Sequence, residues 1–248
     1  MKDTMMFINN NIYNDKLHYL EIGNSTYKLA VKSDDNTFNI LRTNSPDEIS
    51  NLIVDKKILI AITSQNVANY SNVDFEKSNL EIIEINKLFT FISDTYSPPE
   101  SIGLDRILNL YGLENDSIVV SCGTAITIDS IKNNSPIWGA ILPGFKVMFN
   151  SLNKTIPNLP TSDFDLIPKI PAKNTTDSIA NGTSKALFYA ISGIINEIEL
   201  LYFNSIKQQI IITGGNALYL SNNLNSKSII IEDLIFKGME RYYKLFCL

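Results

Sequence analysis

Two glycine-containing turns, each between apolar segments typical of strands, most constrain how this chain can fold. The first lies in residues 20–28, which read LEIGNSTYK, and the second lies in residues 119–129, which read VVSCGTAITID. The tip of such a turn exposes backbone N–H groups and hydroxyls, which can hold phosphate oxygens without the lysine of a P-loop. A single copy is weak evidence, because many β-hairpins carry one. Two copies, one opening each half of the chain, predict a duplicated nucleotide-binding architecture.

The apolar pattern around the turns predicts two similar series of strands and helices. The first series has strands at 17–22, 27–32, 37–42 and 57–63, a helix from Pro46 with Ser45 as its N-cap, and a helix at 101–111. The second has strands at 117–122, 125–131, 137–142 and 209–213, and helices at 145–153, 174–204 and 233–247. The stretch 64–92 has mixed signals, and 155–173 is typical of an irregular loop or lid.

Two such series predict two related α/β domains that face each other across a cleft. We place the N-terminal domain at 16–112 and the C-terminal domain at 113–248, after a flexible extension at 1–15. The alternative that the pattern leaves open is a single α/β domain with two unrelated hairpins.

The charge balance argues against nucleic acid as the main partner. The formal net charge is −5 and the isoelectric point is near 5.0, with lysines scattered along the chain. A protein that binds a polyanion needs a concentrated basic face. A small anionic substrate remains compatible, because a few positioned donors suffice for it.

The cysteine count and the hydropathy pattern predict a cytoplasmic protein with no membrane segment. The chain has two cysteines, Cys122 and Cys247, and no stretch of membrane-spanning length or apolar signal core. His18 is the only histidine, and we expect it to be structural. A catalytic histidine or a zinc site is therefore not expected.

A second group of candidate residues opens the helix predicted at 101–111. Gly103-Leu104-Asp105-Arg106 places a carboxylate in the first helical turn, where the helix dipole stabilises it. Asp105 is either a helix-start carboxylate or a general base beside an arginine anion clamp, and the residues alone leave both open. Thr175 begins the long helix, where capping is the commoner role and substrate contact the alternative.

Together these motifs resemble the type III pantothenate kinases, also called the Bvg accessory factor family. The resemblance covers nearly the whole chain from Tyr19 onward, and its motifs occur in the family's order. They are Glu21 to Ser25 with Lys28, Tyr96 with Gly103 to Arg106, Gly123-Thr124 with Asp129, Gly139 with Pro143-Gly144, Leu152 with Thr155 and Leu159-Pro160, Asn174-Thr175 with Gly182, and Gly214-Gly215.

The resemblance implies two ribonuclease-H-like domains of the acetate kinase, sugar kinase, Hsp70 and actin superfold. It implies ATP-dependent phosphorylation of pantothenate to 4'-phosphopantothenate, the first step of coenzyme A synthesis, by a homodimer that uses Mg²⁺ and a monovalent cation, K⁺ or NH₄⁺. Asp105 would be the general base. The implied substrate contacts are Tyr96, Gly103, Leu104, Asp105, Arg106 and Thr175. The implied ATP contacts are Glu21, Ile22, Gly23, Asn24, Ser25, Thr26, Tyr27, Lys28 and Thr124.

Three positions depart from the family pattern. Glu21 stands where the family has the aspartate of its first phosphate loop, so a Mg²⁺ contact here would pass through water. Ser121 stands where the family has the aspartate that binds the monovalent cation, which predicts weak dependence on that cation. Trp138 replaces a usual glycine. Glu21 and Ser121 favour the alternative of a non-catalytic regulatory paralogue, and a kinase for another small hydroxylated acid is a further alternative.

Overall fold

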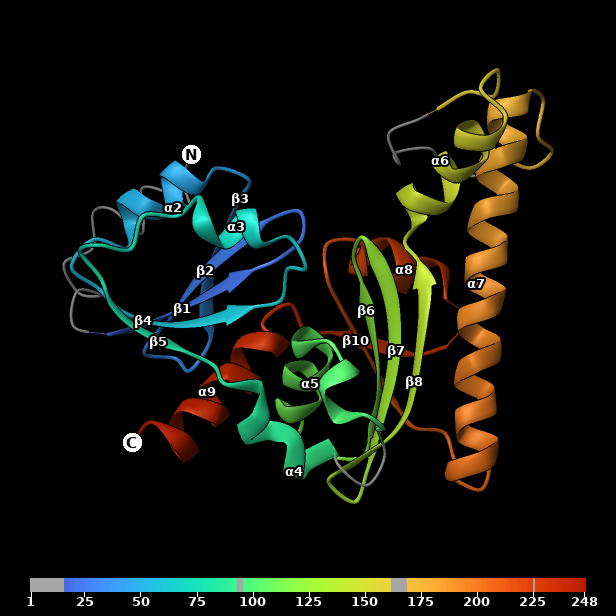
Figure 1. Ribbon diagram of the computed structural model, residues 1–248. Coiled ribbons are helices and arrows are strands. Elements are labelled where there is room, and N and C mark those ends of the chain that lie inside the picture. The colour runs from blue at the N-terminus through green and yellow to red at the C-terminus, as the bar shows by residue number, and fades with distance from the viewer. Residues whose placement is uncertain (1–15, 93–95, 162–168, 225) are drawn as a thin grey trace. The chain divides into compact units, whose positions relative to one another are not determined.

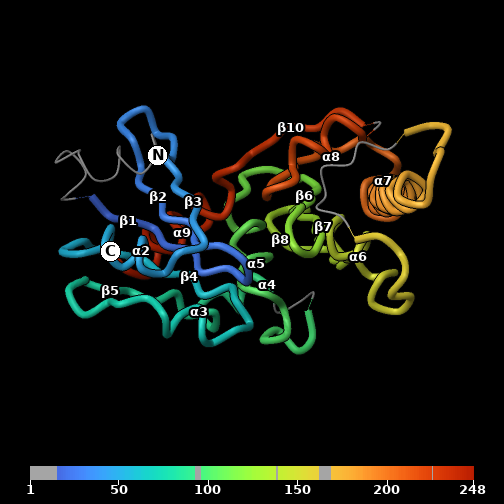
Figure 2. The backbone as a smooth tube through the Cα atoms, turned by 90° about the horizontal axis from the view of Figure 1, so that it is seen from above, coloured from blue at the N-terminus to red at the C-terminus, as the bar shows by residue number. Residues whose placement is uncertain are grey.

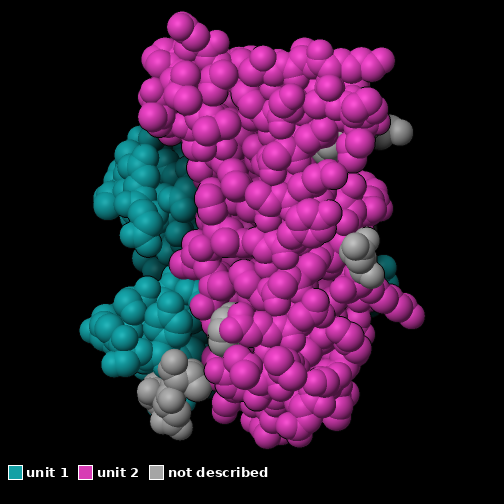
Figure 3. Space-filling view, turned by 90° about the vertical axis from the view of Figure 1, so that its right-hand side faces the viewer, with its two compact units in different colours: residues 1–113, 233–248 teal, residues 114–232 magenta. Residues whose placement is uncertain are grey.

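The computed structural model describes residues 16–92, 96–161, 169–224 and 226–248, so the extension expected at 1–15 lies outside the described residues. The chain divides into two compact units, coloured separately in Figure 3. Residues 1–113 together with 233–248 form unit 1, and residues 114–232 form unit 2.

Unit 1 is built on a five-stranded sheet with the order β3-β2-β1-β4-β5 (Figure 1). The first three strands are antiparallel neighbours, whereas β4 and β5 run parallel to β1. The strands are β1 (Leu17–Ile22), β2 (Tyr27–Lys32), β3 (Phe38–Thr43), β4 (Lys57–Ile62) and β5 (Asn79–Ile82). The carboxyl ends of β1 and β4 therefore lie side by side, next to the first glycine-containing turn.

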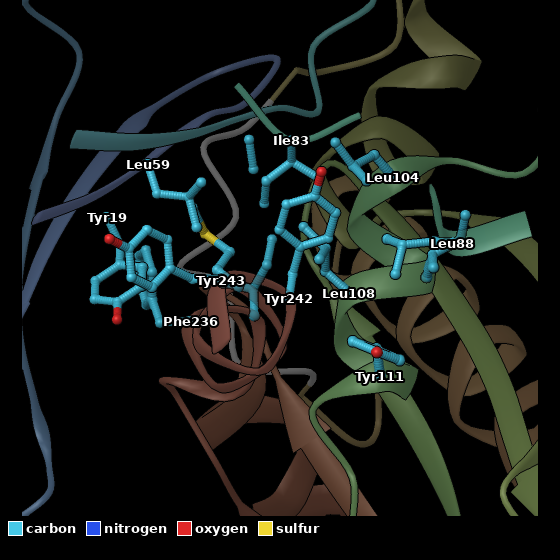
Figure 4. Packing of buried hydrophobic residues seen from close by; sticks show 14 of the residues in the cluster. Tyr19, Leu59, Ile83, Leu88, Leu104, Leu108, Tyr111, Phe236, Tyr242 and Tyr243 are labelled. Carbon is cyan, nitrogen blue, oxygen red and sulfur yellow. The ribbon is translucent and has the colours of Figure 1, made fainter. Parts of the chain in front are cut away.

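Helices cover both faces of this sheet. One face packs on α2 (Pro46–Leu52), whose N-cap Ser45 accepts a hydrogen bond from Glu48 N, as the sequence predicts. The other face packs on α5 (Leu104–Tyr111) and α9 (Leu234–Phe246). Figure 4 shows this second cluster, in which aromatic side chains of α9 lie beside residues of the sheet and of α5. Its labelled members are Tyr19, Leu59, Ile83, Leu88, Leu104, Leu108, Tyr111, Phe236, Tyr242 and Tyr243.

The domain boundary expected from the sequence differs from the structure at α9. The sequence predicts that 113–248 form one half, but α9 belongs to unit 1. The reason is close packing on α5: a Cβ atom at Gly238 would overlap the Leu108 carbonyl, and one at Gly112 would lie 2.7 Å from Leu234 O. The two helices approach closely because glycines line their contact.

Unit 2 repeats the topology of unit 1. Its sheet has the order β10-β9-β6-β7-β8, in which β6, β7 and β8 are antiparallel neighbours and β9 and β10 run parallel to β6. The strands are β6 (Ser117–Cys122), β7 (Ala125–Lys132), β8 (Ser135–Pro143), β9 (Gln209–Thr213) and β10 (Ser228–Ile230). The duplicated architecture predicted from the two turns is confirmed, and the alternative of a single domain is wrong.

Three helices accompany the sheet of unit 2. They are α6 (Phe145–Thr155), α7 (Thr175–Tyr202) and α8 (Ala217–Asn223). Figure 2 shows α7 almost end-on, close to α6. Residues from all three helices join one buried cluster with the apolar residues of β6, β7 and β9.

The stretch 64–92, where the sequence signals are mixed, holds several short elements. These are α3 (Val67–Ser71), β5, the 3₁₀ turn η2 (Ile85–Leu88) and α4 (Phe89–Ile92). A further 3₁₀ turn, η3 (Pro99–Ser101), precedes α5. Elements this short carry at most two periods of an apolar pattern, so tertiary packing decides them. None of the helices among the described residues has both the length and the hydropathy needed to cross a bilayer.

Candidate active site

The first glycine-containing turn joins β1 to β2 and is closed by its own backbone. Gly23 N donates to Thr26 O at 3.0 Å. The carbonyl of Ile22 accepts from Thr63 N at 3.0 Å and from Ser64 N at 2.9 Å, so the segment after β4 is bonded directly to the end of β1. The side chains of Asn24 and Ser25, at the tip, are exposed. Such a tip presents polar groups to a ligand from a fixed backbone.

Glu21, at the base of this turn, is a buried carboxylate in an ion pair. Its Oε2 atom lies 2.5 Å from Lys28 Nζ, and its side chain is only 7% exposed. Thr63 donates a second hydrogen bond to Oε1 at 3.2 Å. Glu21 and Lys28 are directly paired residues of β1 and β2, so the sheet register brings these two predicted ATP contacts together.

The second turn joins β6 to β7 and is held by backbone bonds and glycines. Gly123 N donates to Ala125 O at 2.9 Å, and Gly144 N donates to Thr124 O at 2.9 Å. A Cβ atom at Gly144 would overlap the carbonyls of Gly123 and Thr124. Gly214 has a φ of +94°, and a Cβ atom there would lie 2.7 Å from Cys122 O. Only glycine allows these segments to approach the turn so closely.

A row of hydroxyl side chains crosses the sheet of unit 2 beneath this turn. Ser121 on β6 is paired with Thr127 on β7 and with Thr213 on β9, so all three side chains point to the same face. Thr127 and Thr213 are buried. Thr127 Oγ1 has no hydrogen-bond partner among the described residues, which is uncommon for a buried hydroxyl.

Cys122 lies next to Ser121 but is no candidate nucleophile. Its side chain is fully buried in the apolar cluster of unit 2. This burial raises the pKa of the thiol to about 12, so the reactive thiolate does not form near neutral pH.

Asp105 lies in the first turn of α5, as the sequence predicts. The N-cap is Gly103, and the side chain of Asp105 folds back over it: a Cβ atom at Gly103 would lie 2.6 Å from Asp105 Oδ1. Glycine therefore leaves the space that the carboxylate occupies. A carboxylate at this end of a helix is stabilised in its ionised form, the form a general base requires.

Arg106, the residue after Asp105, forms a stacked, hydrogen-bonded pair with Tyr96. Arg106 Nη1 donates to Tyr96 Oη at 2.9 Å, and the guanidinium carbon lies 5.4 Å from the centre of the tyrosine ring. Arg106 is only 4% exposed. The structure thus brings together two predicted substrate residues from different segments. Leu104, a third one, is part of the buried cluster of unit 1.

The role of Thr175 as a helix cap, favoured on the residues alone, is wrong. The N-cap of α7 is Asn174, whose Oδ1 accepts from Asp177 N at 2.8 Å and whose Nδ2 donates to Asp177 Oδ2 at 3.0 Å. Asn174 and Asp177 therefore complete the cap without the neighbouring hydroxyl. Thr175 is exposed at the start of the helix.

The predicted site residues fall into both units. Unit 1 carries residues 21–28, Tyr96 and residues 103–106, whereas Ser121, Thr124 and Thr175 belong to unit 2. Sequence reasoning missed Thr63, Ser64 and Asn69, which contact the first turn. The one signal for Ser64 and Asn69 was the polar stretch that begins directly after the strand at 57–63, whereas Thr63 lies at the end of that predicted strand.

The oxygen donors of these residues differ in how well they suit the metals that the sequence resemblance implies. The Glu21 carboxylate is a hard oxygen donor, and Mg²⁺ commonly keeps several waters and uses few carboxylates, so a water-mediated contact fits. Ser121, where the resemblance implies a ligand of a monovalent cation, offers a neutral oxygen beside two threonine hydroxyls, without the charge of a carboxylate. No group of three or more His, Cys, Asp or Glu side chains suited to a metal occurs within the described ranges.

Comparisons with known proteins point to one family. A family model described as type III pantothenate kinase matches residues 19–197. A type III pantothenate kinase from Kosmotoga olearia is 34% identical over 155 residues, and the match spans 59% of this chain and 59% of that protein. Another, from Flavobacterium johnsoniae, is 25% identical over 238 residues, which span 91% of this chain and 96% of the relative.

Solved structures agree in fold. A Campylobacter jejuni protein assigned to the Baf family of transcriptional activators has a TM-score of 0.61 and 26% identity, covering 92% of this chain and 97% of its own. A Sinorhizobium meliloti protein assigned as a 2-dehydro-3-deoxygalactonokinase has a TM-score of 0.53 at 10% identity, covering 94% and 97% of the two chains, which concerns the fold alone. The repeated strand order is that of the actin, Hsp70 and sugar kinase fold, as the sequence predicts.

Proposed function

The chain belongs to the type III pantothenate kinase family, and we propose that it transfers the γ-phosphoryl group of ATP to the primary hydroxyl of pantothenate. The observation that most supports this is the start of α5. There a carboxylate, Asp105, folds over a glycine N-cap, and the next residue forms a stacked pair with a tyrosine. A proton acceptor and an anion-binding group are thus adjacent in one helical turn.

In the proposed reaction, Asp105 accepts the proton of the pantothenate hydroxyl. The hydroxyl oxygen forms a bond to the γ-phosphorus, the bond from that phosphorus to the bridging oxygen breaks, and ADP leaves with the bond's electron pair. Most of the catalysis in such a transfer comes from positioning and electrostatics, which suits a base on a rigid helix.

Arg106 and Tyr96 are proposed to bind the acid. A guanidinium offers a planar fork of N–H donors that matches a carboxylate, and the stacking on Tyr96 restricts its orientation. Gly103, Leu104 and Thr175 are proposed to complete the contacts with pantothenate.

The two turns are proposed to hold ATP, the first through residues 21–28 and the second through Thr124. Both are short and fixed by backbone bonds, so their peptide N–H groups are oriented before nucleotide arrives. Mg²⁺, when bound, neutralises phosphate charge, and Glu21 is proposed to reach it through water. Ser121 supplies no charge for a monovalent cation, so we propose that the reaction depends only weakly on one, if at all. We also propose that the protein acts as a homodimer in the cytoplasm.

An ADP-release assay with purified protein tests the proposal. Turnover should require pantothenate and be lost when another small hydroxylated acid replaces it. If ATP is consumed only with a different acid, the protein is a kinase for that acid. Nucleotide binding without turnover on any acid would favour a regulatory paralogue, the class suggested by Ser121 and by the Baf-family assignment of the Campylobacter relative.

A further inference from the structure

A side-chain amide from α3 reaches the first turn. Asn69 Nδ2 lies 2.9 Å from Gly23 O, 3.3 Å from Asn24 O and 3.0 Å from Ser64 Oγ. Two successive carbonyls of the turn therefore accept from one amide. Asn69 is half-buried, so these bonds are partly shielded from water.

Two other hydrogen bonds connect the turn and the start of β2 to the segment after β4 and to α3. Asn24 Oδ1 accepts from Gln65 N at 3.0 Å, which ties the tip to the segment after β4. Tyr27, the first residue of β2, donates from its hydroxyl to Asn69 O at 2.9 Å. Asn69 is thus the residue of α3 that bonds to the turn and to the strand that follows it.

The start of α3 has anchors that do not involve the Asn69 side chain. Its N-cap is Asn66, whose side chain accepts from Ala68 N at 3.1 Å. The chain leading into it is bonded through Thr63 N and Ser64 N to Ile22 O. A change at the Asn69 amide therefore alters the turn while the backbone around it keeps its own anchors.

The corresponding turn of unit 2 is also held by backbone hydrogen bonds. Gly144 N donates to Thr124 O, and Asn216 N donates to Cys122 O at 3.0 Å. These are backbone bonds supported by the close approach of Gly144 and Gly214. In the first turn the carbonyls of Gly23 and Asn24 accept hydrogen bonds from a side chain in addition to the backbone bonds, so a single substitution at Asn69 removes both of these contacts.

We infer that Asn69 is a positioning residue for nucleotide phosphate. In a trans peptide the C=O and N–H groups point in opposite directions. Holding the carbonyls of Gly23 and Asn24 toward Asn69 therefore points the N–H groups of Asn24 and Ser25 away from it, as phosphate donors. This inference rests on the proposed function, in which the turn holds ATP phosphates. It adds a residue outside the turn that sets the orientation of those donors.

The test measures affinity of the full-length protein for a non-hydrolysable ATP analogue by calorimetry, and the Michaelis constants for ATP and pantothenate. Asn69→Asp places a carboxylate oxygen against two carbonyls, and Asn69→Ala removes the donor. Asn72→Asp is the matched control. It makes the same change at the end of α3, where the side chain is exposed and has no hydrogen bond to the turn within the described part of the chain.

Both Asn69 variants should bind the analogue about tenfold more weakly, with the larger loss for Asp, whereas Asn72→Asp should stay within about twofold. The Michaelis constant for pantothenate should stay within about twofold in all three. Unchanged analogue affinity in both Asn69 variants would overturn the inference, as would equal losses for ATP and pantothenate. If the unmodified protein binds the analogue without phosphorylating pantothenate, the proposed function fails, and weaker analogue binding by the Asn69 variants still supports the inference.

Discussion

Glu21 and Ser121 occupy the same position in two sheets of identical strand order. Each is the second-to-last residue of the central strand of its sheet, just before the turn. Each is paired with one residue of an antiparallel strand and one residue of a parallel strand. In unit 1 the antiparallel neighbour is Lys28, which neutralises the carboxylate. In unit 2 the antiparallel neighbour is Thr127, so neither Ser121 nor this paired residue carries a charge.

The uncharged row around Ser121 predicts weak or absent dependence on K⁺. A carboxylate about 4 Å from a monovalent cation contributes roughly 4 kcal/mol of attraction at an effective dielectric constant of about 20, before desolvation offsets it. Ser121→Asp restores that charge and should introduce or strengthen K⁺ activation. The measurement is turnover against KCl, with ionic strength held constant by a bulky organic cation. A steep, saturable K⁺ requirement in the unmodified protein would sink this prediction.

Asp105→Asn should abolish phosphoryl transfer while preserving the fold. The amide keeps the size of the side chain above Gly103 but cannot accept the substrate proton, a loss typically worth about 10²–10⁴-fold in rate. Steady-state turnover and thermal unfolding should be measured on the same preparation. Turnover within about threefold of the unmodified protein would rule out Asp105 as the base.

Arg106→Ala should raise the Michaelis constant for pantothenate far more than that for ATP. The loss of a charged hydrogen bond to a carboxylate predicts a change of about tenfold or more. Arg106→Lys keeps the charge but loses the fork and should recover only part of the affinity. Equal changes for both substrates would contradict the assignment.

Arg241→Ala is the matched control for that experiment. Arg241 also stacks on a tyrosine, 4.6 Å from the ring centre of Tyr111, but its guanidinium donates to the carbonyls of Tyr111 and Leu113. Its removal should lower the melting temperature and leave the Michaelis constant for pantothenate unchanged. The pair of variants separates loss of substrate contact from loss of an arginine–tyrosine stack.

Gly144→Ala should destabilise unit 2 and weaken nucleotide binding. The added methyl group overlaps two backbone carbonyls of the second turn, and overpacking of this kind costs about 1–3 kcal/mol. Gly182→Ala is the control, because a Cβ atom there has no atom within 4 Å, and alanine in a helix is favoured over glycine by about 0.5–1 kcal/mol. In chemical unfolding, the free energy of unfolding should fall for Gly144→Ala and rise for Gly182→Ala.

His18 should make the protein less stable in mild acid. Its side chain is buried on β1, and this burial lowers its pKa below the ordinary 6.5, although a hydrogen bond to Lys16 O opposes the shift. The unfolded chain then binds the proton more readily than the folded one. The free energy of unfolding should therefore fall as pH drops below 6.5, toward the lowered folded-state pKa. Since His18 is the only histidine, His18→Gln should flatten this slope in urea unfolding at several pH values.

Much of this architecture can be predicted from the sequence, because strong local patterns agree with the fold. The two turns, the strands on either side of them and the cap at Ser45 depend on neighbouring residues. The contacts of Asn69 could not be predicted, since they join segments separated by three strands and a helix. The partner of α9 also could not be predicted: an apolar face shows that a helix is buried, but not which sheet it covers.

The placement of α9 has a consequence for the order in which the chain is made. The ribosome synthesises residues 114–232, the whole of unit 2, before it reaches α9. Until then unit 1 lacks Phe236, Met239 and Tyr242, which fill its larger apolar cluster. Unit 1 therefore begins to emerge first but is completed only after unit 2. During that interval the sheet of unit 1 carries an uncovered apolar surface of the kind that chaperones bind.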